Sequence, residues 1–174
     1  MKPFSAKTLV WLSMLVLTAC AQHPALPEET PPMALPLQLH VQRLDSNGVR
    51  DWILIIQQDG PALRWSLLDP LGVPLARQLL RHGKWQNDGL LPPNPQAREL
   101  FAALLFALTR SEDLDRLYPG RELTQSLGQR SMKLNASTAW HVRYGKNRRF
   151  DLDVGPSLTY GVAPIESAPG AVSQ

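Results

Sequence analysis

Apolar and polar residues alternate along the chain from Leu37 onward. Leu37, Leu39 and Val41 are separated by polar residues, as is typical of a strand with one buried face. The Asn47-Gly48 pair that follows favours a hairpin turn, because glycine adopts a positive φ at little cost. Similar short segments predict further strands over residues 51–58, 62–69 and 73–81, and a fifth that starts at 84–86.

One segment has the periodicity of a helix instead. Asn94 is a good N-cap, and Pro95 suits the first helical position. Between residues 96 and 110 an apolar face recurs at helical spacing, formed by Leu100, Leu104 and Leu108 with Phe101 and Leu105 beside them. Because this face is wide, we expect the helix to lie against a sheet.

After this helix the pattern returns to strands. Residues 111–118 predict a second, shorter helical or irregular segment, which ends at Pro119-Gly120. Strands are then predicted over residues 123–134, 139–144, 148–154 and 157–165. This order predicts a mainly β fold with helices (α+β), in which a curved antiparallel sheet carries a helix on its concave side.

The first 19 residues have the pattern of an export signal. Lys2 and Lys7 precede an apolar run of 11 residues from Leu9 to Ala19. That length is typical of a signal peptide and is too short for a bilayer-spanning helix, which needs roughly 20 apolar residues. We therefore expect residues 1–19 to be a signal peptide.

The apolar run ends in Leu17-Thr18-Ala19-Cys20, which resembles the lipobox of bacterial lipoproteins. The resemblance implies cleavage before Cys20 and attachment of acyl chains such as palmitate to this cysteine, the only one in the chain. Each buried methylene contributes about 0.8 kcal/mol, so two or three acyl chains would form a nearly permanent anchor. The alternative is an ordinary secretory signal followed by a chance cysteine.

The residues after Cys20 predict where the protein resides. Aspartate at position 21 favours retention in the inner membrane, and alanine stands there instead, which indicates the outer membrane with the domain facing the periplasm.

Five of the 16 residues from 21 to 36 are proline, which predicts an extended tether. The expected organisation is a signal peptide (1–19), a lipidated cysteine with its tether (20–36), a folded domain (37–165) and a disordered tail (166–174).

Composition and charge exclude several function classes. Without residues 1–19 the chain loses two of its 18 lysines and arginines and none of its 15 acids, so its formal net charge is +1. The high pI therefore gives no argument for nucleic-acid binding. No cysteine remains for a disulfide, and the four histidines have no metal-ligand spacing. With no nucleophile motif and no glycine-rich phosphate loop, we expect neither enzyme activity nor a metal or cofactor.

Two clusters of charged residues each leave two interpretations. Asp151 and Asp153 would share one face of a strand, where acids are usually solvated and only occasionally catalytic. A predicted hairpin is surrounded by four cations, Arg143, Lys146, Arg148 and Arg149. We expect these cations to be solvated, and the alternative is contact with anionic lipid headgroups or an acidic carrier.

Several motifs occur in an order that resembles the LolB family of outer-membrane lipoprotein receptors. A strand ending in Leu67-Leu68-Asp69-Pro70-Leu71-Gly72 is followed by another strand and by the polar Asn87-Asp88-Gly89. The helix then leads to a Leu-x-x-Leu-Tyr-Pro-Gly stretch at Leu114–Gly120, and Trp140–Tyr144 is similar to the family's Trp-x-Val-x-Tyr strand. The resemblance covers roughly half of the chain. The length of the chain and its C-terminal half fit a smaller relative of the LolB receptor better than they fit the receptor itself.

The resemblance implies an unclosed β-barrel whose hydrophobic cavity is plugged by one or two helices. In the family this cavity receives the acyl chains of an incoming lipoprotein, which a periplasmic LolA-like carrier supplies. A leucine in the Pro-Leu-Gly loop helps deliver the lipoprotein into the membrane, and the matching loop is Pro70, Leu71 and Gly72. Exposing one leucine is also common in ordinary turns, which is the alternative for Leu71.

A cavity of this kind would be lined by apolar residues of the strands and the helix. The residues expected there are Ile53, Ile55, Leu63, Trp65, Leu67, Leu75, Leu100 and Leu104. An ordinary hydrophobic core is the alternative, because alternation does not show which face of a strand points inward. The expected function is accordingly binding and transfer of a lipidated or lipid-like ligand, and the alternative is a structural envelope lipoprotein with a solid core.

Overall fold

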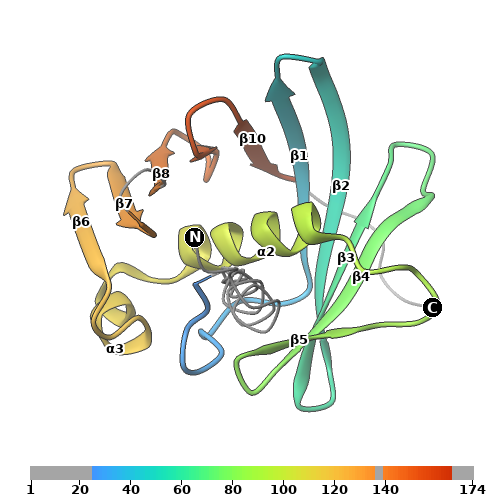
Figure 1. Ribbon diagram of the computed structural model, residues 1–174, viewed down its shortest axis with the longest axis horizontal. Coiled ribbons are helices and arrows are strands. Elements are labelled where there is room, and N and C mark those ends of the chain that lie inside the picture. The colour runs from blue at the N-terminus through green and yellow to red at the C-terminus, as the bar shows by residue number, and fades with distance from the viewer. Residues whose placement is uncertain (1–24, 136–138, 166–174) are drawn as a thin grey trace, which may run out of the picture.

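The structure, a computed structural model, describes residues 25–135 and 139–165. The described residues form a mainly β fold with one ten-stranded antiparallel sheet (Figure 1). The first five strands are β1 (Leu37–Asp45), β2 (Gly48–Asp59), β3 (Ala62–Leu68), β4 (Pro74–Arg81) and β5 (Lys84–Asn87). Then come helix α2 (Pro95–Leu108), the short 3₁₀ helix η1 (Ser111–Asp113) and helix α3 (Leu114–Leu117). The last five strands are β6 (Glu122–Ser126), β7 (Gln129–Lys133), β8 (Ala139–Tyr144), β9 (Phe150–Val154) and β10 (Thr159–Pro164).

The sheet consists of two meanders joined in the middle. Strands β1 to β5 form the first meander and β6 to β10 the second, and the two join because β10 pairs with β1. At this junction Val41 lies opposite Val162. The edges of the described sheet are therefore β5 and β6, which do not pair with each other, so the sheet is not closed.

Helix α2 carries the chain from one edge of the sheet to the other. Figure 1 shows α2 crossing the concave side of the curved sheet, between the β5 end and the β6 end. Neighbouring strands rotate by about 20–25° relative to each other, so ten strands accumulate enough twist to wrap around a helix. The prediction of a mainly β fold with helices and an antiparallel, unclosed sheet is confirmed.

Two aromatic clusters join α2 to the two halves of the sheet. At the middle of the helix, the Phe101 ring lies 5.4 Å from the Trp65 ring and 5.7 Å from the Trp85 ring, measured between centroids. Near its end, the Phe106 ring lies 6.1 Å from that of Trp140 on β8. Aromatic pairs at such separations contribute about 0.5–1.5 kcal/mol beyond the area that they bury.

The beginning of α2 follows the sequence prediction. The side chain of Asn94 accepts a hydrogen bond from the backbone N–H of Ala97 at 3.0 Å, and Pro95 occupies the first turn. The helix ends at Leu108, two residues earlier than predicted, because Thr109 has an extended backbone with ψ of 136°.

The end of α2 is held by side chains that the sequence did not indicate. Arg130 of β7 is only 9% exposed, and its guanidinium donates hydrogen bonds to the carbonyl oxygens of Phe106 (3.3 Å) and Thr109 (2.7 Å). Tyr144 of β8 donates to the carbonyl oxygen of Ala107 at 2.7 Å. These bonds satisfy carbonyls that a helix end leaves unpaired, and the cation lies at the negative end of the helix dipole.

Residues 25–36, which the sequence predicts to be part of the tether, pack against the domain. Ala25 is buried in the core, and the backbone N–H of Glu28 donates to the carbonyl of Leu117 at 3.0 Å. Glu29 forms a 2.8 Å ion pair with Arg116 of α3. The apolar residues that share the segment with the prolines cover part of the core, so the folded domain includes residues 25–36. Residues 1–24 and 166–174 lie outside the described residues.

Candidate functional site

Strand register decides which residues of β2 face α2. Leu54 lies opposite Leu67, and Ile56 lies opposite Trp65, whose ring contacts Phe101 of the helix. Cross-strand partners point to the same face of a sheet, so Leu54 and Ile56 point to the concave side. Alternation then puts Ile53 and Ile55 on the convex face. The prediction that these two residues line the interior is therefore wrong.

Five of the residues expected to line a cavity belong to the hydrophobic core. They are between 0% and 3% exposed and pack in one cluster between α2 and the sheet: Leu63, Trp65, Leu67, Leu100 and Leu104. The helix thus fills much of the concave side with its own apolar side chains.

A pocket opens at the start of α2, and we call it the mouth pocket. It has a volume of about 370 Å³ and lies between the first turns of the helix and the concave face of the sheet. Its lining residues are Arg50, Trp52, Leu67, Asp69, Leu75, Asn94, Gln96, Ala97, Leu100 and Tyr160. The structure thus brings three of the predicted cavity residues, Leu67, Leu75 and Leu100, together at one opening.

A β-bulge explains how Leu75 comes to line the mouth pocket. The register between β3 and β4 shifts between Leu67 and Leu68: Pro74 lies opposite Leu68, and Ala76 lies opposite Leu67. Leu75 is the extra residue on β4, and bulges commonly re-aim a side chain in this way. Leu75 is 37% exposed, so it is an accessible apolar group at the pocket rim.

The loop between β3 and β4 presents Leu71 to solvent in a defined geometry. The side chain of Asp69 accepts hydrogen bonds from the backbone N–H groups of Leu71 (2.9 Å) and Val73 (2.8 Å). Gly72 has a positive φ of 84°, which a residue with a side chain rarely adopts. Leu71 is 89% exposed.

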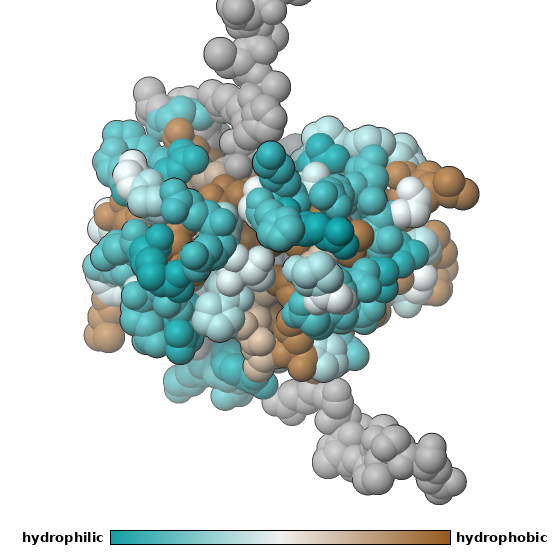
Figure 2. All heavy atoms as spheres, turned by 90° about the horizontal axis from the view of Figure 1, so that it is seen from below, coloured by the Kyte–Doolittle hydropathy of each residue, from teal (hydrophilic) through white to brown (hydrophobic). Residues whose placement is uncertain are grey.

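Apolar side chains gather at the end of the molecule that holds the mouth pocket. Figure 2 shows hydrophobic side chains projecting at the right-hand end, where Figure 1 places the β3–β4 loop and the segment between β5 and α2. Leu71 and Val73 belong to the first of these segments and Leu90, which is fully exposed, to the second. Leu75, at the start of the next strand, is exposed as well and lines the mouth pocket.

Aromatic and charged groups border the other side of the mouth pocket. The rings of Trp52 and Tyr160 lie 6.2 Å apart, and the Arg43 guanidinium lies 6.0 Å from the Trp52 ring. Burial raises the pKa of Tyr160 to about 12, so its hydroxyl stays neutral at physiological pH. Sequence reasoning missed Trp52 and Tyr160, although Trp52 continues the alternation of the buried Leu54 and Ile56.

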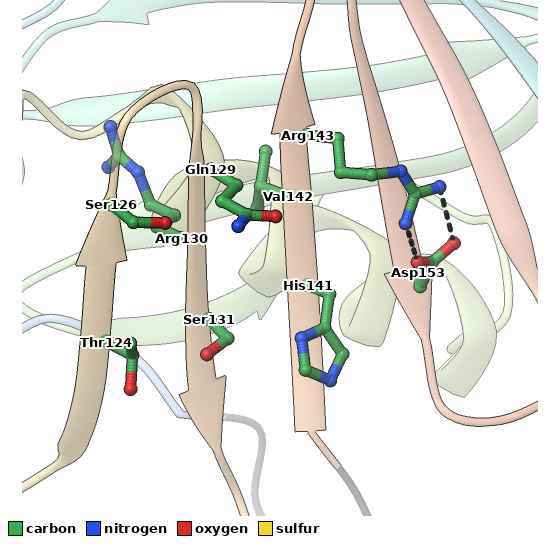
Figure 3. Close-up of a pocket in the computed structure, with 9 residues that line it drawn as sticks. All are labelled: Thr124, Ser126, Gln129, Arg130, Ser131, His141, Val142, Arg143 and Asp153. Carbon is green, nitrogen blue, oxygen red and sulfur yellow. Dashed lines mark hydrogen bonds and ion pairs between the residues drawn. The ribbon is translucent and has the colours of Figure 1, made fainter.

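A second, polar hollow lies on the convex face of β6 to β9 and has a volume of about 360 Å³ (Figure 3). Strand register brings Ser131, His141 and Asp153 side by side there, since Ser131 lies opposite His141 and His141 opposite Asp153. No hydrogen bond joins these three side chains within the described residues. Asp153 instead accepts hydrogen bonds from Arg143, as Figure 3 shows, and from Thr159 at 2.8 Å.

These hydrogen bonds determine the charge of the hollow. Burial alone would raise the pKa of Asp153, but the hydrogen bonds from Arg143 and Thr159 outweigh it and hold this pKa below its ordinary value. The Asp153 carboxylate thus stays ionised and bonded to Arg143 and Thr159. In the part of the chain that the structure describes, it makes no hydrogen bond that would orient His141 as a general base. Asp151 is 3.8 Å from Arg143 and is likewise part of a surface ion pair. We assign no catalysis to this hollow.

Some of the predicted features fall on residues that the structure does not describe. Cys20 and the signal peptide precede residue 25. Within residues 25–135 and 139–165, no helix has the length and hydrophobicity needed to cross a bilayer. In the same residues, no group of three or more histidine, aspartate or glutamate side chains is arranged to hold a metal ion.

The sequence was compared with models of protein families and with curated proteins. No model of a protein family matches the sequence, and no curated protein matches it. The function is therefore argued from the geometry of the mouth pocket and its neighbouring loop.

Proposed function

We propose that this protein is an outer-membrane lipoprotein that binds a lipidated or lipid-like ligand at the mouth pocket and helps to transfer it to the membrane. The observation that carries the proposal is that Leu71, Val73 and Leu75 follow one another as exposed apolar residues and that Leu75 lines the mouth pocket. Exposure of the Leu71 side chain to water at the tip of a hydrogen-bonded loop is unfavourable in itself. A bilayer or an acyl chain would cover it.

The mouth pocket suits the end of an acyl chain. Its volume of about 370 Å³ lies at the lower end of the range usual for small-molecule sites, about 300–1,000 Å³. Leu67 and Leu100 supply an apolar floor, Leu75 an apolar rim, and Trp52 and Tyr160 aromatic walls. Each methylene moved from water into such a site contributes about 0.8 kcal/mol.

A longer acyl chain needs more volume than the mouth pocket has. Because the sheet is not closed, movement of α2 could provide that volume. We treat the fold as a half-barrel plugged by α2. The end of the helix is held by Arg130 and Tyr144, whereas its start is joined to the sheet by apolar packing and by the bond from Arg98 to Asn87 at 3.0 Å. Lifting the first turns of α2 would extend the mouth pocket toward the core beneath the helix.

In this proposal the rest of the chain supports delivery. Acyl chains on Cys20 would hold the protein on the outer membrane, with the domain in the periplasm. A LolA-like periplasmic carrier would bring the ligand to the mouth pocket. Leu71 would then enter the bilayer surface and open an apolar route for the ligand. No cofactor or catalytic group takes part.

The experiment that tests ligand binding places a charge on the pocket rim. We expect Leu75→Glu to weaken binding of a fluorescent fatty acid by at least about tenfold, because a carboxylate at an apolar site must be desolvated when the chain enters. Leu44 is a matched control, since it is also 37% exposed and lies on the convex face, away from the mouth pocket. Leu44→Glu is expected to bind within about twofold of the unchanged protein. Equal binding by the Leu75→Glu protein, or no binding by the unchanged protein, would contradict the proposal.

A second function is favoured by the packing beneath α2. Leu104, Phe101 and Phe106 are fully buried, and the helix occupies the space that an open half-barrel would offer a ligand. This solid interior fits a structural envelope lipoprotein that binds other envelope proteins through its surface. The fatty-acid titration separates the two functions, because a protein with a solid core takes up no chain stoichiometrically.

A further inference from the structure

Three buried polar atoms without partners lie beneath the first half of α2. The indole nitrogens of Trp65 and Trp85 and the side-chain oxygen Oε1 of Gln78 have no hydrogen-bond partner among the described residues. Trp65 and Gln78 are 0% and 2% exposed. About 90% or more of the buried polar groups in proteins are hydrogen-bonded, so three neighbouring exceptions call for an explanation.

The three side chains, which we call the polar trio, are neighbours on the concave face. Gln78 of β4 lies directly opposite Trp65 of β3. Trp85 of β5 lies opposite Leu80, which places it diagonally across from Gln78. The two indole rings meet edge to face with their centroids 5.7 Å apart, and Phe101 of α2 contacts both.

The polar trio lies directly behind the floor of the mouth pocket. Leu67 lines the pocket, and Trp65 is the next residue of β3 that points to the same face. On β4, Gln78 is likewise the next such residue after Ala76, which pairs with Leu67. Two residues of a strand span about 6.6 Å, so a chain that passes Leu67 would reach the trio within that distance.

The chemistry of the polar trio specifies what it would bind. The two indole N–H groups are donors only, and Oε1 of Gln78 is an acceptor. A hydroxyl group has one hydrogen to donate and two lone pairs to accept with, so it matches two donors and one acceptor in number and kind. A plain hydrocarbon chain would leave all three unsatisfied.

We propose that the polar trio binds a hydroxyl group on an apolar chain, so that the preferred ligand is a hydroxylated acyl chain. This inference rests on the proposed function, because the chain must first enter the mouth pocket. It adds selectivity: the pocket supplies affinity for hydrocarbon, and the trio discriminates between chains that are otherwise alike. Rejection of a chain that lacks the hydroxyl follows because buried polar groups would stay unpaired.

The test compares stearic acid with its positional hydroxy isomers as competitors of a fluorescent fatty acid. The full chain is used, with Cys20→Ser to prevent lipidation. We expect one narrow range of hydroxyl positions to bind at least about tenfold more tightly than stearic acid. Gln78→Met keeps the length of the side chain and removes the acceptor, and it should reduce this preference to within about twofold. Gln86→Met, an exposed position on the neighbouring strand β5, should keep the preference.

A second measurement needs no substitution at the site. In ¹⁵N-¹H spectra, the indole N–H signals of Trp65 and Trp85 should move downfield when the preferred hydroxy isomer binds, and stearic acid should not produce this shift. Equal affinity for stearic acid and every hydroxy isomer would overturn the inference alone and would indicate that an ordered water satisfies the trio. Failure of the unchanged protein to bind any of these chains would overturn the proposed function itself.

Discussion

At the residue scale, the hydrogen bonds of one loop fix Leu71 in an exposed position. Asp69 accepts two backbone N–H groups of the loop through its side chain, and its carbonyl accepts the N–H of Gly72 at 3.0 Å. The loop cannot fold inward without breaking these bonds, so the leucine stays in water.

At this scale we predict that Leu71→Glu separates binding from delivery. Fatty-acid binding and the free energy of unfolding should change little, because the side chain contacts no core residue. Transfer of a bound chain to phospholipid vesicles should slow by at least about tenfold, since a carboxylate resists entry into the bilayer. Vesicle transfer of a fluorescent fatty acid measures the rate. Leu127→Glu, at a fully exposed leucine of the β6–β7 turn, is the control, and similar rates for both proteins would rule out the role of Leu71.

At the scale of elements, helix α2 is held asymmetrically. Its end is joined to β7 and β8 by charged and hydroxyl hydrogen bonds, and its start borders the mouth pocket. Arg130 has no carboxylate partner within the described residues; it lies 4.9 Å from the Tyr144 ring and donates to helix carbonyls. Burial lowers the pKa of Arg130, but an arginine remains charged at physiological pH. Any opening of the helix is therefore expected at its start.

We predict that Arg130→Met lowers the free energy of unfolding by about 2–3 kcal/mol, because the carbonyl oxygens of Phe106 and Thr109 lose a charged donor at a buried helix end. Arg121→Met removes an exposed arginine next to β6 and should change stability by less than about 0.5 kcal/mol. Urea unfolding followed by tryptophan fluorescence measures both. Equal stabilities of the two variants would show that the contacts of Arg130 do not hold the helix end.

At the scale of the whole molecule, the packing of residues 25–36 shortens the link between Cys20 and the domain. Five backbone steps separate Cys20 from Ala25 and span at most about 18 Å when fully extended. With Cys20 lipidated, the region around Ala25, between α3 and the β4–β5 turn, would lie close to the bilayer. Leu71 lies at the opposite end of β4 from that turn, so the leucine would reach the same bilayer with β4 lying along its surface.

We predict that Ala25→Asp destabilises the whole domain. Ala25 is 2% exposed within the core cluster, so an aspartate there would bury an unpaired carboxylate and lower the free energy of unfolding by about 1–3 kcal/mol. Ala34→Asp introduces the same residue at an exposed position of the same segment and should change stability by less than about 0.5 kcal/mol. Chemical denaturation compares the two. An unchanged stability of Ala25→Asp would mean that the segment is a free tether after all.

The local periodicity of the sequence was enough to predict most strands and α2. Asn94 and Pro95 marked the start of the helix, and the alternation from Leu37 marked β1, because capping and alternation act over only a few residues. The resemblance at the Pro-Leu-Gly loop pointed to Leu71. Of the predicted cavity residues, Leu67, Leu75 and Leu100 reach the mouth pocket, whereas the choice of Ile53 and Ile55 was wrong.

What the sequence alone determined is the set of elements and the exposed loop, together with the lipobox-like start that lies outside the described residues. Only the tertiary structure decided which face of β2 points inward, how the bulge turns Leu75 toward the pocket and where residues 25–36 pack. The physical reason is that alternation has a period of two, so a shift of one residue exchanges the faces and leaves the pattern intact. The choice is made by partners distant in the chain, such as Trp65 against Phe101 and Ala25 against the core.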